Sequence, residues 1–174
     1  MDIERWKKKI AHDKDVLNDI KNEMDKWLIN NEPDSKYIKV NKQGDLFSGF
    51  DSSPKVFINW NSQKQVLPIF KKYGVDTSKI DKDTKEDKDS LNAKVLGPQK
   101  SKCSLIPLYL RYKEMMKLCS TYGENVLEQI DKKTARLYTN FNSLGTDTAR
   151  ISSGGKDKAA GIEYVNMLNM PADA

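Results

Sequence analysis

The chain has few residues of the types that bind metals or form disulfides. Its 174 residues include two cysteines, Cys103 and Cys119, and one histidine, His12. The cysteines are too far apart in sequence for a C-x-x-C metal site, so we expect two reduced residues in the core or at the surface. A single histidine argues against histidine-based catalysis, and His12 is predicted to lie on a solvated helix face.

Long hydrophobic runs are also missing. No apolar stretch approaches the roughly 18 residues that a membrane-spanning helix needs, and the N-terminus, MDIERWKKKIAHDKD, lacks the apolar segment of a signal peptide. With 37% hydrophobic and 32% charged residues, the chain suits one soluble domain, or one domain with an appended element. These absences predict a cytoplasmic protein.

The charge is only mildly biased to one sign. Lys and Arg number 30 and Asp and Glu number 25, which gives a formal net charge of +5. This excess favours an anionic partner such as nucleic acid, but many solvated proteins reach it without one. Charge alone therefore does not decide the function.

Two stretches have the apolar period of a long amphipathic helix. The first covers residues 2 to 30, and it ends before Pro33 because proline cannot continue a helix. The second covers residues 104 to 130, where Gly123 predicts a break or bend after Tyr122. We expect these two helices to pack antiparallel.

The segments between the two long helices have weaker patterns. Residues 36 to 58 resemble a hairpin-like insertion with its turn near residues 41 to 45. A short helix is predicted to begin after Asn61 or Ser62 and to end at Gly74. Residues 76 to 89, DTSKIDKDTKEDKD, have almost nothing to bury and are predicted to form a solvated, mobile loop.

The last part of the chain is predicted to contain a β hairpin. Its strands are residues 136 to 141 and 146 to 151, followed by a loose loop at 154 to 163 and a semi-extended tail at 164 to 171. The predicted fold class is mostly α with a small β component (α+β). We expect a helical domain at residues 1 to 135 and a hairpin segment at 136 to 174.

The predicted hairpin also carries a recognisable motif. FNSLGTDTARISS, residues 141 to 153, resembles the F-N-x-x-G-T-x-T-G-R-[LI]-S-S motif of family A DNA polymerases, the DNA polymerase I type. YVNMLNMPADA resembles the N-L-Q-N-I-P segment that follows it in the family. YKEMMKLCSTYGENVL and FINWNSQKQVLPIFKKYGV are similar to two thumb segments, and MDIERWKKK is similar to the start of the first thumb helix. These blocks occur in the family order over nearly the whole chain. The sequence departs from the pattern at Ala149, where glycine is usual, and at Leu168, where glutamine is frequent.

The resemblance covers the thumb and the first palm hairpin only. It implies a DNA-binding piece of a template-directed DNA polymerase that grips primer–template DNA through its backbone and minor groove. In the family, two Mg²⁺ ions are held by palm aspartates that lie further along the chain. We therefore expect no cofactor in this chain, Mg²⁺ in the full polymerase, and the palm and fingers portion as a partner in cis or in trans. The acidic residues have no spacing that suggests a metal site, so the chain is expected to be inactive alone.

The resemblance implies a set of DNA-binding residues. These are Arg150, Thr146, Thr148, Ser152, Ser153, Asn142, Asn166, Asn169, Lys117, Ser120, Thr121 and Tyr122. An arginine can bridge the minor-groove acceptors that all base pairs share, and hydroxyl groups can donate to phosphate oxygens. The alternatives are a surface ion pair for Arg150, turn chemistry for the small polar residues, and helix packing for Tyr122.

Two other functions stay open at this point. The chain could be a stand-alone, non-catalytic DNA-binding module or the subunit of a split polymerase. It could also be an interaction protein built on its first amphipathic helix, with accidental motif matches.

Overall fold

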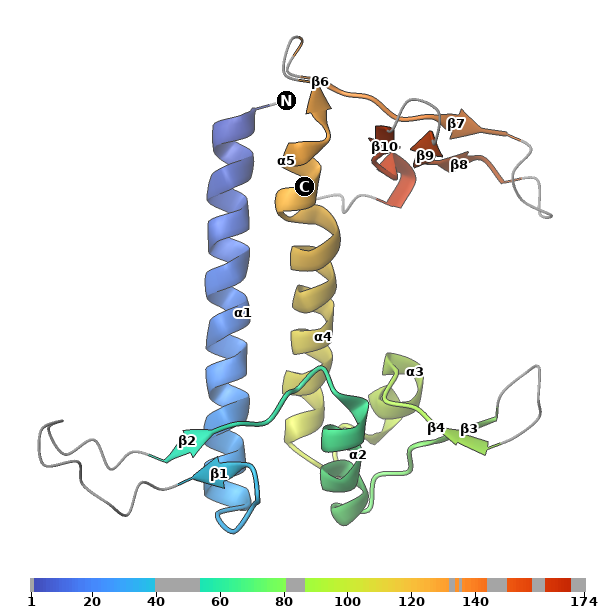
Figure 1. Cartoon of the computed structure of the whole chain (residues 1–174). Helices are drawn as coiled ribbons and strands as arrows, with labels where there is room; N and C mark the ends of the chain where they lie inside the picture. The colour runs from blue at the N-terminus through green and yellow to red at the C-terminus, as the bar shows by residue number, and fades with distance from the viewer. Residues whose placement is uncertain are drawn as a thin grey trace, which may run out of the picture. The chain divides into compact units, whose positions relative to one another are not determined.

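The computed structural model describes residues 2–39, 54–80, 87–131, 134, 136–143, 150–157 and 162–169. They form two compact units: unit 1 combines Met1–Asp15 with Met115–Ala174, and unit 2 is Val16–Glu114. The two long helices, α1 and α4, each contribute to both units (Figure 1). The predicted domain boundary at residue 135 differs from this division and stays a prediction.

The long helices agree with the periodicity of the sequence. Helix α1 is Ile3–Asn31, helix α4 is Leu105–Tyr122, and helix α5 is Glu124–Glu128. The predicted break after Tyr122 is confirmed, and Gly123 explains it: a Cβ atom at position 123 would lie 2.2 Å from the carbonyl oxygen of Cys119. In the described part of the chain, no helix is long and apolar enough to cross a membrane.

Unit 1 has a small core between the start of α1 and α5. Trp6, Ile10 and Val126 are buried there, and Tyr122, Leu127 and Leu137 pack around them. Lys14 and Glu124 form an ion pair of 2.6 Å beside this core. Both side chains are exposed, so this ion pair contributes little stability and the apolar contacts hold the two segments together.

Unit 2 has the larger core, which lies between the end of α1, the start of α4 and helix α2, Gln63–Lys72. Its fully buried large side chains are Met24, Leu28, Trp60, Val66, Phe70, Leu96, Leu105, Ile106 and Tyr109. Trp27, near the end of α1, donates its indole N–H to Ser104, just before α4, over 2.8 Å. The two helices are therefore antiparallel here, as predicted.

The boundaries of α2 follow local signals. The helix begins after Ser62, and Gly74, with a φ of 68°, follows its last turn. Glycine adopts this left-handed conformation without the steric cost that a side chain brings. The predicted helix end at Gly74 is confirmed. Helix α3, Ala93–Leu96, and the short η1, Gly97–Gln99, complete the helical part of unit 2.

The strands form five two-stranded antiparallel pairs among the described residues. These are β1 (Ile38–Lys39) with β2 (Lys55–Val56), β3 (Ser78–Ile80) with β4 (Asp87–Asp89), β5 (Ile130–Asp131) with β6 (Arg136–Leu137), β7 (Phe141–Asn142) with β8 (Ser152–Ser153), and β9 (Gly155–Asp157) with β10 (Ile162–Tyr164). A short η2, Met167–Asn169, follows β10. The predicted fold class, mostly α with small β hairpins, is confirmed.

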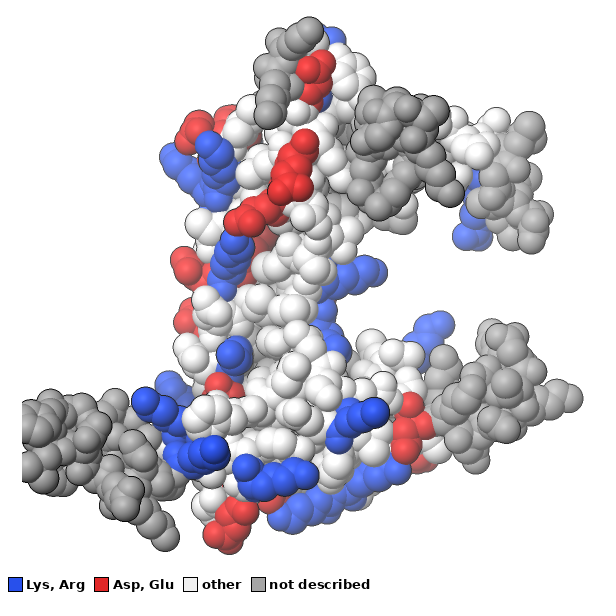
Figure 2. Space-filling model, in the orientation of Figure 1, with Lys and Arg blue, Asp and Glu red and all other residues white. Residues whose placement is uncertain are grey.

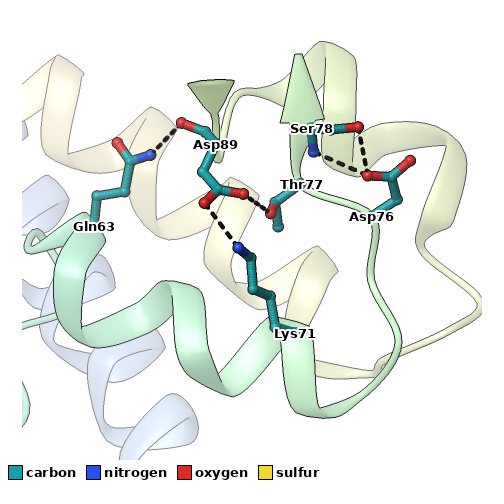
Figure 3. A network of polar contacts seen from close by, with 6 residues as sticks. All are labelled: Gln63, Lys71, Asp76, Thr77, Ser78 and Asp89. Atoms are coloured by element: carbon teal, nitrogen blue, oxygen red, sulfur yellow. Dashed lines mark hydrogen bonds and ion pairs between the residues drawn. The ribbon is translucent and has the colours of Figure 1, made fainter. Parts of the chain in front are cut away.

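The prediction of a mobile loop at residues 76 to 89 is wrong where β3 pairs with β4. A network of polar contacts takes the place of apolar burial there (Figure 3). The carboxylate of Asp89 accepts from Lys71 over 2.8 Å and from the Thr77 hydroxyl over 2.6 Å, and its carbonyl accepts from Gln63. Composition shows that the segment is polar, but two of these partners, Lys71 and Gln63, belong to α2, which lies earlier in the chain.

Two predictions for the end of the chain are also corrected. Residues 136 to 141 do not form one strand: β6 pairs with β5, and only β7 pairs with β8. The predicted loose loop at 154 to 163 contains the paired strands β9 and β10. The predicted turn at residues 41 to 45 lies outside the described residues, and so does the second half of the predicted turn at 142 to 145.

Candidate nucleic-acid interface

The residues predicted to bind DNA all belong to unit 1, and the structure separates them into two groups. We call Asn142, Arg150, Ser152, Ser153 and Asn166 the hairpin group, and Lys117, Ser120, Thr121 and Tyr122 the helix group. Thr146, Thr148 and the side chain of Asn169 lie outside the described residues.

The pair β7–β8 arranges the hairpin group. Phe141 lies opposite Ser153, and Asn142 lies opposite Ser152. The Ser152 hydroxyl donates to the backbone carbonyl of Asn142 over 3.3 Å. Because successive residues of a strand point to opposite faces, Asn142 and Ser152 share one face, and Phe141 and Ser153 share the other. Asn142 and Arg150 are exposed at this hairpin.

A second contact joins β8 to the segment around η2. Ser153 is 8% exposed, and its hydroxyl donates to Oδ1 of Asn166 over 2.9 Å. The hydroxyl oxygen of Ser153 in turn accepts the backbone N–H of Leu168 over 3.0 Å. Nearby, the hydroxyl of Thr139 donates to the carbonyl of Val165 over 2.7 Å. The two motif segments, 141–153 and 164–169, therefore form one local structure.

Gly154, which the sequence predicts to lie in a loose loop, allows this close approach. Its φ is 91°, and a Cβ atom here would lie 3.1 Å from the backbone N and Cα of Asn166 and from the carbonyl oxygen of Tyr164. Its own N–H donates to the carbonyl of Asn140 over 3.0 Å. The signal in the sequence was the Gly154-Gly155 pair directly after the motif.

The helix group lies at the end of α4. Lys117, Ser120 and Thr121 are exposed, whereas Tyr122 is half-buried against Trp6 and its neighbours in the core of unit 1. The Ser120 hydroxyl donates to the carbonyl of Lys117 over 3.2 Å. Helix packing thus gives Tyr122 a structural role, while the other three present a cation and two hydroxyls to solvent.

Basic side chains gather along α4 on the visible face of the molecule (Figure 2). Arg111 and Lys117 are exposed on this helix, and Lys113 is half-buried with its ammonium group 5.8 Å from the ring centroid of Tyr109. By contrast, acidic and basic side chains are mixed along the first half of α1. The positive residues of α4 thus suit a phosphate backbone.

The described residues offer no metal site. Among them, no group of three or more His, Cys, Asp or Glu side chains could hold a metal ion. Several carboxylates are instead paired with lysines, as in Glu32–Lys72 and Asp89–Lys71.

The comparisons with known proteins agree with the motifs. The sequence profile of DNA polymerase family A matches residues 50–156. DNA polymerase I of Borreliella burgdorferi is 38% identical over 96 residues, which are 55% of this chain and 10% of the relative. The thermostable DNA polymerase I of Thermus aquaticus is 35% identical over 96 residues, 55% of this chain and 11% of the relative. The chain therefore spans about a tenth of the length of these relatives. Because the family profile covers more than half of its residues, the chain belongs to DNA polymerase family A.

Proposed function

We propose that this chain is the thumb and palm-entry portion of a DNA polymerase and that it holds primer–template duplex DNA. The observation that carries the proposal is the joining of the two motif segments through Ser153 and Asn166. The motif residues Asn142, Arg150 and Asn166 are exposed on this local structure. This local structure therefore carries one guanidinium and two carboxamides on residues that are exposed.

These groups suit the recognition of duplex DNA without sequence preference. N3 of adenine and O2 of thymine are minor-groove acceptors, and A·T and T·A pairs present them alike. A guanidinium or an amide N–H₂ can donate to such acceptors, and Arg150 and Asn166 supply these donors. Lys117 and Thr121 supply an ammonium group and a hydroxyl that can donate to phosphate oxygens, and such contacts position a duplex without reading its sequence. The hydroxyl proton of Ser120 already goes to the Lys117 carbonyl.

Exposed apolar side chains favour a further protein partner for unit 1. Of the six large hydrophobic side chains exposed in the described residues, five lie between residues 138 and 168. They are Tyr138, Phe141, Ile151, Met167 and Leu168. Several large apolar side chains left exposed within one short segment are typical of an interaction site. We propose that it packs against the palm and fingers portion, in cis or in trans, which would also bring the Mg²⁺ site. This surface argues against a stand-alone DNA-binding module.

Duplex binding tests the proposal directly. The fluorescence anisotropy of a labelled primer–template is measured with the chain at several salt concentrations. Arg150→Ala should weaken binding by about 1–3 kcal/mol, and Lys117→Ala should lower the salt slope by about one unit. Lys8→Ala is the matched control, because Lys8 is an exposed lysine on the face of α1 opposite the buried Trp6 and Ile10. An affinity that changes neither with salt concentration nor in the Arg150→Ala variant would overturn the proposal.

The partner is tested by adding the palm and fingers portion of a family A polymerase in trans. We expect primer extension that depends on Mg²⁺ and on both polypeptides. Phe141→Ser with Ile151→Ser should abolish the association and leave the helical content of the chain unchanged. Association that survives both substitutions would show that these apolar side chains are not the docking surface.

A further inference from the structure

The hydroxyl of Ser153 joins β8 to the segment around η2, where it donates to Asn166 and accepts from Leu168. We infer that Ser153 is a positioning residue: it orients the carboxamide of Asn166 so that the amide nitrogen faces the duplex. This inference rests on the proposed function, because it assigns a role to a residue of the same DNA-binding surface.

The hydrogen bonds of Ser153 determine which way the carboxamide faces. A serine hydroxyl has one proton to donate and two lone pairs that accept. Its oxygen accepts the Leu168 N–H over 3.0 Å, and its proton goes to Oδ1 of Asn166 over 2.9 Å. If the carboxamide were flipped, Nδ2 would donate to the hydroxyl. The hydroxyl proton of this side chain, 8% exposed, would then lack an acceptor among the described residues.

The orientation leaves the two N–H groups of Asn166 available. The residue as a whole is exposed, and among the described residues no acceptor contacts its Nδ2 atom. Minor-groove acceptors require donors on the protein, so this orientation is the productive one. A side chain that is already held in its binding geometry also loses less conformational entropy when the duplex binds.

The backbone beside Asn166 is held by contacts that do not involve Ser153. The Thr139 hydroxyl donates to the carbonyl of Val165, and Val165 is 6% exposed. Gly154 lies so close to the Asn166 backbone that a Cβ atom at position 154 would come within 3.1 Å of its N and Cα atoms. Removing the Ser153 hydroxyl should therefore free the carboxamide of Asn166 while the segment stays docked. Thr139→Val, which removes a hydrogen bond from the same segment, is the matched control.

Two measurements on the whole chain test the inference. The first is the side-chain N–H₂ resonance pair of Asn166 in the free protein. Ser153→Ala should move this pair to the shifts of a freely rotating asparagine, whereas Thr139→Val should leave it in place. An unchanged pair in Ser153→Ala, or the same change in Thr139→Val, would overturn the positioning role.

The second measurement is a double-mutant cycle on duplex affinity. We expect Asn166→Ala and Ser153→Ala each to weaken binding by about five- to tenfold, which corresponds to one hydrogen bond. Ser153→Ala should have no further effect in the Asn166→Ala background, because the serine acts only through the asparagine. Ser153→Thr retains the hydroxyl and should restore both the affinity and the resonance pair.

These experiments distinguish a failure of the proposed DNA-binding role from a failure of the positioning role of Ser153. If Asn166→Ala leaves the affinity unchanged while Ser153→Ala still frees its carboxamide, the DNA-binding role of Asn166 is wrong and the local geometry is right. If Ser153→Ala weakens binding equally with and without Asn166, the serine does not act through it, and the inference is refuted.

Discussion

The same substitution should have very different effects on stability at two tryptophans of this chain. Trp6 in unit 1 and Trp60 in unit 2 are both buried, at 8% and 1% exposure. The indole N–H of Trp60 donates to Oδ1 of Asp25 over 2.7 Å. Among the described residues, the indole N–H of Trp6 has no hydrogen-bond partner. Phenylalanine removes the N–H from either site and keeps an aromatic ring.

The expected magnitudes follow from these partners. In Trp60→Phe a hydrogen bond to a charged group is lost, which costs about 1.5–3 kcal/mol, and the half-buried Asp25 is left without its donor. In Trp6→Phe the lost ring contacts destabilise the fold by up to about 1.5 kcal/mol. This loss is offset because the unpaired buried N–H, which destabilises the wild-type protein by about 1–3 kcal/mol, is also removed. Trp6→Phe should therefore change stability by less than about 1 kcal/mol, and Trp60→Phe should destabilise its unit by about 2 kcal/mol or more.

Urea unfolding followed by far-UV circular dichroism measures the free energy of unfolding of both variants. Hydrogen exchange in the two halves of α1 then assigns each change to its unit. Trp6→Ala serves as a control for packing and should cost about 3–5 kcal/mol, because it empties the core of unit 1. Equal losses for the two phenylalanine variants would refute the reasoning, since the Trp6 N–H would then have a partner, such as a buried water.

Three further predictions follow from backbone and charge. Gly155→Ala should lower the free energy of unfolding by about 1–3 kcal/mol, because the φ of 117° at this position is strained for alanine. Gly154→Ala should lower it further, because the new Cβ atom would also meet the Asn166 backbone. Thermal unfolding compares the two variants. Burial raises the pKa of Asp25 above its usual 3.8, so the folded state holds this proton more tightly than the unfolded state. Its contribution to stability should therefore fall as pH rises from 3.8 through the raised pKa, and a pH titration of Asp25→Asn should lack this step. Asp89→Asn removes the ion pair with Lys71. It should speed hydrogen exchange at the backbone N–H of Ser90, which donates to the carbonyl of Thr77. An unchanged exchange rate would show that the ion pair does not stabilise the β3–β4 pair.

Some candidate site residues could be found from the sequence because their signal is local. The order of the residues around Arg150 and Asn166 carries the family motif, and both residues are exposed in the structure. Their binding role stays a prediction. The role proposed for Ser153 could not be predicted in this way. A serine in a motif can face a ligand or the protein interior, and only its contacts with Asn166 and Leu168 decide which.

In the fold, too, some elements could be predicted from the sequence and others could not. Helices α1 and α4 and the break at Gly123 could be predicted, because apolar period and helix-breaking residues act over one or two turns of the chain. The strands β3 and β4 could not, because Asp89 is held by Lys71 from helix α2. The alternation of apolar and polar residues from 136 to 141 likewise did not show that β6 pairs with β5 while β7 pairs with β8.

The sequence by itself therefore determined the helical elements and the family motifs of this chain, since both are written in residues that are close along the chain. Only the tertiary structure decided which strands pair, which tryptophan has a hydrogen-bond partner, and which way the Asn166 carboxamide faces. The physical reason is that a polar group satisfies its hydrogen bonds with whatever donor or acceptor folding brings within about 3 Å, however distant that partner is in sequence.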